Sequence, residues 1–176
     1  MRIAYLFPTV DEAKGFLIEN PKALVFVTGV GAAAVAATTI KAAKAKRPHL
    51  MILAGIAGAY DHELHKGEVV EVVSDRMGEL PSKYIEEYQL EPLTELRRVK
   101  SNTVSRCGGE ANGAQIEQME GAAFFAVCEA LDIEAAQIRA ISNYVGEPKE
   151  EWCIEEALKS LTTTLTELKF DDESTS

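Results

Sequence analysis

Residues 23–58 read ALVFVTGVGAAAVAATTIKAAKAKRPHLMILAGIAG and contain the clearest pattern of secondary structure in the chain. The two apolar runs of this stretch, residues 23–27 and 50–54, are typical of short buried strands. Between them, an alanine-rich segment predicts a helix over Ala32–Lys46, because lysine and arginine occupy its last turn and Pro48 follows as a stop. The stretch therefore predicts a strand, a helix and a second strand.

The same alternation continues on both sides of this unit. Further apolar runs that predict strands lie at residues 2–7, 69–73, 99–104 and 136–141. Segments with helical character lie at residues 11–18, 117–131 and 150–168. Strands that alternate with helices indicate an α/β protein with a central mixed, largely parallel sheet. We expect one domain over residues 1–170 and a disordered polar tail at residues 171–176.

Composition and charge exclude several functional classes. The chain has 176 residues, of which 47% are hydrophobic, which is enough for one domain with a sizeable core. Its 18 lysines and arginines against 28 acidic residues give a net charge of −10. Nucleic acids and anionic membranes repel such a surface, so neither is an expected partner. There is no apolar run near ~18 residues and no basic leader, so we expect a cytoplasmic protein.

Cysteine and histidine spacing predicts neither a disulfide framework nor a metal centre. The three cysteines (Cys107, Cys128 and Cys153) are an odd number without CxxC spacing, which indicates reduced thiols. His62 and His65 lie in a short polar loop that has no third ligand at a suitable spacing. We expect no metal and no cofactor.

Two glycine turns follow predicted strands, TGVG at residues 28–31 and GIAG at residues 55–58. Glycine lets a ligand approach backbone N–H groups closely, but it also serves tight packing, and both interpretations stay open. Because neither turn contains GxGxxG or GK[ST], a nucleoside triphosphate site is not expected.

Polar residues gather where predicted strands end. Asn143 closes the strand that begins near residue 136, and Glu12 follows the first strand. Glu120 lies in the first turn of an apolar helix, where a carboxylate either complements the helix dipole or has a functional role. Ligands in α/β sheets bind at the carboxyl ends of strands, where these residues and both glycine turns fall.

The order of these motifs resembles the purine nucleoside phosphorylase and nucleosidase superfamily. The set consists of Glu12, TGVG (28–31), AGIAG (54–58), VVSD (72–75), MEGA (119–122) and RAISN (139–143). Within that superfamily, ISNYV (141–145), followed by an acidic stretch and Trp152, is most similar to the futalosine hydrolases of menaquinone biosynthesis. The resemblance covers residues 1 to about 165. It implies a three-layer α/β/α nucleoside phosphorylase/hydrolase-like fold and a purine nucleoside substrate.

The resemblance also assigns roles to individual residues. Glu12 would be the base that deprotonates the attacking water, Glu120 would bind the ribose hydroxyls, and Asn143 would face the purine. The substrate-binding set that the resemblance implies consists of Gly31, Gly55, Gly58, Met119 and Ser142. A carboxylate near the sugar suits an oxocarbenium-like transition state, since it stabilises the developing positive charge.

Two residue choices narrow the implied reaction. Phosphorylases of this superfamily carry an arginine just after the first strand, whereas residues 6–12 hold no arginine and two carboxylates. This favours water over phosphate as the nucleophile. Nucleosidases that act on 6-aminopurines usually have aspartate where this chain has Asn143. An amide matches the O6 and N7 edge of a 6-oxopurine better, which favours futalosine with hypoxanthine as leaving group.

Three alternative functions stay open on the sequence alone. They are a methylthioadenosine/adenosylhomocysteine nucleosidase, a purine nucleoside phosphorylase and a non-catalytic nucleoside-binding relative. The chain is short between residues 75 and 99, where relatives carry part of the pocket rim, so we expect a homodimer or higher homo-oligomer. Arg76, Arg98 and Arg106 are unranked candidates for binding the futalosine carboxylate.

Overall fold

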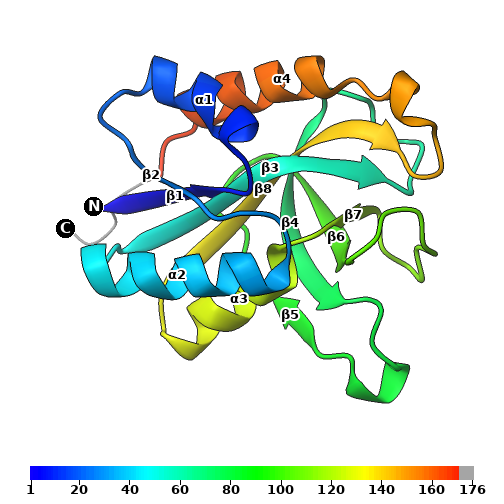
Figure 1. The fold of residues 1–176 in the computed structure, drawn as a ribbon, viewed down its shortest axis with the longest axis horizontal. Coiled ribbons are helices and arrows are strands. Elements are labelled where there is room, and N and C mark those ends of the chain that lie inside the picture. The colour runs from blue at the N-terminus through cyan, green and yellow to red at the C-terminus, as the bar shows by residue number, and fades with distance from the viewer. Residues whose placement is uncertain (171–176) are drawn as a thin grey trace.

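The computed structural model describes residues 1–170; the predicted disordered tail at 171–176 lies outside the described residues. The helices are α1 (Val10–Glu19), α2 (Ala32–Lys46), α3 (Gly121–Ala130) and α4 (Ile154–Glu167). The strands are β1 (Ile3–Phe7), β2 (Leu24–Val27), β3 (Leu50–Ala59), β4 (Val69–Met77), β5 (Glu87–Gln89), β6 (Arg97–Thr103), β7 (Ile116–Gln118) and β8 (Glu134–Tyr144). Figure 1 shows three layers, with α1 and α4 on one face of the sheet and α2 and α3 on the other. No helix within residues 1–170 is long and apolar enough to cross a bilayer.

The sheet is mixed, and most of its pairings are parallel. β1 lies between β2 and β3, β8 runs parallel to β3, and β6 runs parallel to β4 and β7. The antiparallel pairs are β3 with β7, β4 with β5 and β4 with β8. The α/β class with a mixed, largely parallel sheet is therefore confirmed.

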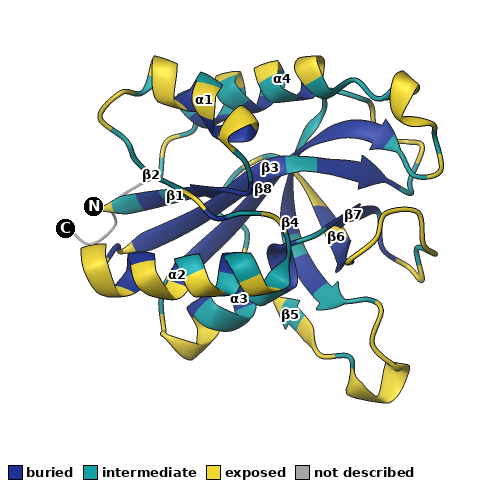
Figure 2. Cartoon of the chain, viewed as in Figure 1, coloured by how far each residue is buried: buried dark blue, intermediate teal, exposed yellow. Residues whose placement is uncertain are grey.

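Each face of the sheet has its own apolar core, because successive side chains of a strand point to opposite faces. Met51 and Leu53 of β3 share one core with Phe124 of α3. Ile52 belongs to the other core, with Leu161 of α4. Figure 2 shows the buried strands between helices whose outer sides are exposed. Because helices cover both faces of the sheet, β3 consists of a continuous apolar run. Each large apolar side chain buried in this way stabilises the folded state by roughly 1.5–3 kcal/mol.

The predicted glycine turn at residues 55–58 is wrong, because β3 continues through it to Ala59. At Gly55 the missing side chain makes room for neighbours: a Cβ there would lie 2.7 Å from Arg139 Nη1 and 2.8 Å from Glu12 Oε1. The glycine serves close packing of functional side chains rather than a turn.

The predicted helix at residues 117–131 is wrong at its start. Residues 116–118 form β7, in which Glu117 pairs with Gly58 of β3, and α3 begins only at Gly121. The Gln118 side-chain oxygen accepts hydrogen bonds from the backbone N–H groups of Glu120 and Gly121, which joins the strand end to the helix start. Helical periodicity alone does not show this local contact.

Other boundaries also differ from the prediction. β4 continues beyond residue 73 and β8 beyond residue 141, because the polar side chains of Ser74, Asp75, Ser142 and Asn143 are buried and hydrogen-bonded inside the protein. The closing helix starts at Ile154 rather than at residue 150, since Lys149–Glu151 forms a separate 3₁₀ turn after Pro148.

The cysteines and the histidine loop take structural positions. Cys107, Cys128 and Cys153 are free thiols, as their spacing predicts. His62 stacks on the ring of Tyr144, with 4.4 Å between ring centroids.

Candidate active site

A cavity of about 290 Å³ opens where β1, β3, β7 and β8 end, next to α1 and α4. The predicted site residues on its wall are Glu12, Gly58, Met119, Glu120, Ser142 and Asn143. Gly31 and Gly55 lie just behind the wall, where each contacts a carboxylate that lines the cavity. The structure thus gathers at one place the residues that the motifs predict for the site.

Glu12 is a buried carboxylate held in a fixed orientation. Thr9 is the N-cap of α1, and its hydroxyl donates to Glu12 Oε2 at 2.8 Å. The N–H of Ile56 donates to Glu12 Oε1 at 3.0 Å. Burial raises the pKa of Glu12 above its ordinary value, and the hydrogen bond from Ile56 and the charge of Arg139 oppose that rise. A carboxylate with a raised pKa is a better proton acceptor at neutral pH than an ordinary one.

Glu120 is also buried, and its carboxylate does not cap its own helix. It is the N-cap residue of α3, but its side chain accepts no hydrogen bond from the N–H groups of that helix. Instead, Oε2 accepts from the N–H of Gly31 at 2.8 Å, and Oε1 pairs with Arg139 Nη2 at 3.2 Å. Gly31 has φ of +100°, a conformation that favours glycine. The Glu120 carboxylate therefore contacts Gly31 and Arg139 rather than capping the N–H groups of its own helix.

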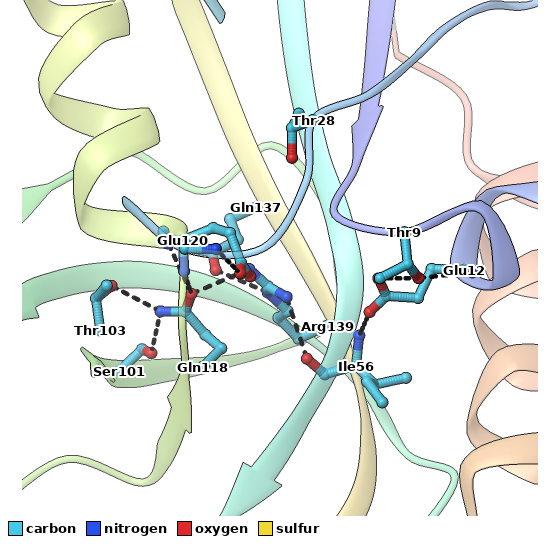
Figure 3. A network of polar contacts seen from close by, with 12 residues as sticks. Thr9, Glu12, Thr28, Ile56, Ser101, Thr103, Gln118, Glu120, Gln137 and Arg139 are labelled. Atoms are coloured by element: carbon cyan, nitrogen blue, oxygen red, sulfur yellow. Dashed lines mark hydrogen bonds and ion pairs between the residues drawn. The ribbon is translucent and has the colours of Figure 1, made fainter. Parts of the chain in front are cut away.

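Arg139 connects the two carboxylates. Its side chain is 1% exposed and lies between the group around Glu120 and the group around Glu12, as Figure 3 shows. Nε donates to Gln137 Oε1 at 2.9 Å, and Nη2 donates to Gln118 Oε1 at 3.0 Å. Nη1 donates to the carbonyl of Ile56, the residue whose N–H holds Glu12. The guanidinium thus has a fixed position between the two acids.

A fully buried aspartate fixes the amides that hold Arg139. Asp75 Oδ2 accepts hydrogen bonds from the side-chain amides of Gln118 and Gln137, at 2.8 and 2.9 Å. Asp75 Oδ1 accepts from the Thr103 hydroxyl at 2.9 Å. Because both amide nitrogens face Asp75, both amide oxygens face Arg139. Burial raises the pKa of Asp75 to about 7.

Asn143 presents an oriented amide to the cavity. Its Oδ1 accepts from the Ser142 hydroxyl at 2.8 Å, and its Nδ2 donates to the carbonyl of Tyr144 at 3.2 Å. An amide nitrogen carries two hydrogens, and its oxygen has two lone pairs, so one donor and one acceptor position remain for a ligand. Apolar residues of the wall include Val30, Trp152, Ile154 and Leu158.

Comparison with known proteins identifies the family. The family model of the phosphorylase superfamily matches residues 12–91 and 100–169. The chain belongs to the phosphorylase superfamily. Among curated members, a futalosine hydrolase of Thermus thermophilus is 32% identical in an alignment that covers 80% of this chain and 78% of that protein.

Solved structures of the superfamily share the fold at low sequence identity. A futalosine hydrolase mutant of Helicobacter pylori superimposes with a TM-score of 0.84 at 13% identity, covering 94% of this chain and 96% of that one. The 5′-methylthioadenosine/S-adenosylhomocysteine nucleosidase of Helicobacter pylori, solved with butyl-thio-DADMe-Immucillin-A, gives 0.82 at 13% identity with the same coverage. These two likenesses establish the fold and no more.

In this superfamily member, the three arginines proposed for the substrate carboxylate do not line the cavity. Arg76 instead donates to Asn102 and to backbone carbonyls of residues 111 and 112, while Arg98 and Arg106 are exposed. Among residues 1–170, the basic side chain on the cavity wall is Arg139. A sequence signal for it exists, since an arginine inside the apolar strand QIRAI needs a buried partner.

The space at Gly55 provides a first prediction. In Gly55→Ala, the new Cβ would overlap with Arg139 Nη1 and Glu12 Oε1, and both groups are held by other hydrogen bonds. We expect kcat to fall by about 10- to 100-fold, as for a displacement of catalytic groups by up to an ångström. Gly109→Ala is the matched control, because nothing lies within 4 Å of a Cβ there. Equal kinetics of the two variants would show that Glu12 and Arg139 do not need this space.

Proposed function

We propose that this chain hydrolyses futalosine to dehypoxanthine futalosine and free hypoxanthine, a reaction of menaquinone biosynthesis. The observation that carries the proposal is the pair of buried acids, Glu12 and Glu120, on one cavity wall with Arg139 between them. The general class of reaction has wider support than the substrate. The futalosine hydrolase relative, the family model and the fold support the assignment of the chain as a nucleoside N-glycosyl hydrolase.

The charge of the cavity supports water rather than phosphate as the nucleophile. Its wall carries four carboxylates (Asp11, Glu12, Glu117 and Glu120) and one guanidinium (Arg139). That guanidinium is already paired with Glu120. A phosphate dianion would therefore meet net negative charge, whereas a neutral water molecule would not.

The proposed chemistry follows from the positions of the acids. Glu12 takes a proton from a water molecule, whose oxygen forms a bond to C1′ while the bond from C1′ to N9 breaks. The electron pair of the broken bond goes to the purine, which takes up one proton at N7 from solvent, while Glu12 releases to solvent the proton that it took, so that the sum is the addition of one water molecule. The sugar gains positive charge in the transition state, and Glu120 stabilises that charge while it binds the ribose hydroxyls. Arg139 holds Glu120 in place for this role.

Asn143 is the proposed reader of the purine 6-position, and a charge change tests it. In Asn143→Asp, a carboxylate would face O6 of hypoxanthine and could donate only when protonated. We expect hypoxanthine nucleosides to lose about 1–3 kcal/mol of transition-state stabilisation, less at low pH. Adenine nucleosides, which offer an amino donor instead of O6, should lose less or gain. An equal loss on both bases, measured as kcat/KM, would show that Asn143 does not read this position.

A second substrate class has one observation in its favour. Val30, Ile154 and Leu158 form an apolar part of the cavity wall, which suits the uncharged methylthio group of methylthioadenosine. Chromatography of the bases released from futalosine, inosine and methylthioadenosine separates the candidates. We expect the highest kcat/KM with futalosine. Preference for methylthioadenosine would transfer the assignment to that class, and no release from any of the three would indicate a binding protein.

The homo-oligomeric state and the cytoplasmic location stay predictions. Sedimentation velocity of the purified chain tests the first, with a homodimer or larger species expected and a pure monomer against it.

A further inference from the structure

Asp75 is a fully buried carboxylate of β4 that does not line the cavity, and the proposed chemistry gives it no part. Its Oδ2 accepts hydrogen bonds from the side-chain amides of Gln118 and Gln137, at 2.8 and 2.9 Å. Its Oδ1 accepts from the Thr103 hydroxyl and from the N–H of Arg76, each at 2.9 Å. An ionised carboxylate only accepts hydrogen bonds and has about four acceptor positions, so these four donors fill them. The contacts of Asp75 are therefore those of a charged acceptor.

The charge of Asp75 determines how the two amides are turned. A glutamine amide can exchange the places of its oxygen and nitrogen with almost no change in shape, so its neighbours decide its orientation. A carboxylate attracts an amide nitrogen and repels an amide oxygen. Because both nitrogens are directed at Asp75, both oxygens are directed at Arg139 (Figure 3). Gln137 Oε1 accepts from Nε of the guanidinium, and Gln118 Oε1 accepts from Nη2.

These contacts pass directly beneath the start of α3. A Cβ at Gly121 would overlap with Asp75 Oδ2 and with the side-chain amide of Gln137. Gly121 is the first residue of α3 and follows Glu120 in the chain. The missing side chain thus lets the acid and the amide meet under the backbone that carries Glu120. The partial positive charge of a helix N-terminus also favours a carboxylate at this point.

We propose that Asp75 is a positioning residue, which acts on Glu120 through Arg139. Its charge orients the amides of Gln118 and Gln137, whose oxygens hold the guanidinium that pairs with the Glu120 carboxylate. Amides turned the other way would present N–H groups to a guanidinium, which has no acceptor, so Arg139 would move away. Glu120 would then lose the partner that fixes its position. The inference rests on the proposed function, because it needs Glu120 to bind the ribose.

Asp75→Asn tests this role, because asparagine has the same shape but carries an NH₂ group in place of one acceptor oxygen. On the side of Oδ2 this group faces the two amide nitrogens, and on the side of Oδ1 it faces the N–H of Arg76. Either arrangement sets donor against donor. We expect kcat/KM to fall by about 10- to 100-fold, as for a displaced catalytic group. The kinetics are measured at about pH 8.5, above the pKa of about 7 that burial gives Asp75.

Glu71→Gln is the matched control. Glu71 is also a buried carboxylate of β4, but its oxygens accept from Leu93 and Thr94, and it does not line the cavity. Both variants replace a buried acid by the corresponding amide, so both should lower the midpoint of thermal unfolding. Well below that temperature, Glu71→Gln should keep the wild-type kcat/KM. A purely structural role predicts the same for Asp75→Asn.

Two further measurements show whether Asp75 acts through Glu120. The loss of kcat/KM on a substrate without the 2′-hydroxyl should be smaller in Asp75→Asn than in the wild type and in Glu71→Gln. Adding Asp75→Asn to Glu120→Gln should lower kcat/KM by less than about 3-fold, because the carboxylate that Asp75 positions is already absent. The substrate is whichever of futalosine, inosine and methylthioadenosine the wild type hydrolyses fastest.

Wild-type kcat/KM in folded Asp75→Asn, or the full loss repeated in the Glu120→Gln background, would overturn the inference and leave the proposed function intact. If Asp75→Asn does not fold, Gln137→Met decides by the same measurements. It keeps Asp75 and its three other donors but removes one of the two amides between Asp75 and Arg139. We expect a loss of about 10-fold with the same dependence on Glu120. If the wild type hydrolyses none of the three nucleosides, the proposed function and this role of Asp75 are both refuted.

Discussion

We expect the Glu12→Gln variant to bind nucleosides normally and to lose kcat on the order of 10³-fold, the typical contribution of a general base. Glutamine has the same shape, and its side-chain oxygen can still accept from the N–H of Ile56. Its amide nitrogen can donate to Thr9 Oγ1, so the local packing should persist. What the variant lacks is a group that can take a proton from water. Single-turnover kinetics with futalosine measure the loss separately from binding.

The pH dependence of the wild type gives an independent test of Glu12. Burial raises its pKa, so protonation inactivates the base at a higher pH than for an ordinary glutamate. We therefore expect kcat/KM to decline as pH falls through a value above 4.5. Glu19→Gln, which changes an exposed carboxylate of the same helix that does not line the cavity, should keep both the rate and this profile. Normal turnover in a folded Glu12→Gln protein would assign the base to another residue.

Glu120→Gln is expected to lower kcat/KM by on the order of 10³-fold, because two hydrogen bonds from ribose hydroxyls to a charged group are weakened. The negative charge that stabilises the cationic sugar is lost at the same time. Stability should also decrease, since the buried guanidinium of Arg139 loses its charged partner. The thermal unfolding midpoint of the variant therefore has to be measured, and its kinetics are determined well below that temperature.

A substrate lacking one hydroxyl separates sugar binding from a general structural defect. With a 2′-deoxynucleoside, the wild type loses the hydrogen bond between Glu120 and the 2′-hydroxyl. In the variant this hydrogen bond is already weakened, so its loss costs less binding energy. We expect the penalty for the missing hydroxyl to be much smaller in Glu120→Gln than in the wild type. A penalty of the same size in both proteins would mean that Glu120 does not bind the sugar.

The strands and helices that are predictable from sequence are those with uniform local signals. α2 has the predicted bounds, and β1, β2 and the first half of β3 lie within a residue of their predicted positions. The sequence-based predictions are wrong where a residue contacts a partner that is far from it in the sequence. Gly55 suggests a turn, but its small size makes room for Arg139 and Glu12, which lie far from it in the chain.

The site could be predicted only in part for the same reason. Glu12, Glu120 and Asn143 are visible in the sequence because they end strands or begin a helix beside recognisable motifs. Arg139 and Asp75 act through contacts that span tens of residues, such as the hydrogen bond from Gln137 to Asp75. The sequence pattern predicts a helix at Glu117, and only the pairing of β7 with β3 places this residue next to Gly58.

Hydrolysis and phosphorolysis differ in the oxygen atom that is added to C1′ of the sugar. Futalosine is incubated with the enzyme in ¹⁸O-labelled water, with and without inorganic phosphate, and the products are analysed by mass spectrometry. We predict equal release of hypoxanthine in both buffers and one ¹⁸O atom at C1′ of dehypoxanthine futalosine. Base release that requires phosphate, with a sugar 1-phosphate as the second product, would mean that the chain is a phosphorylase and not a hydrolase.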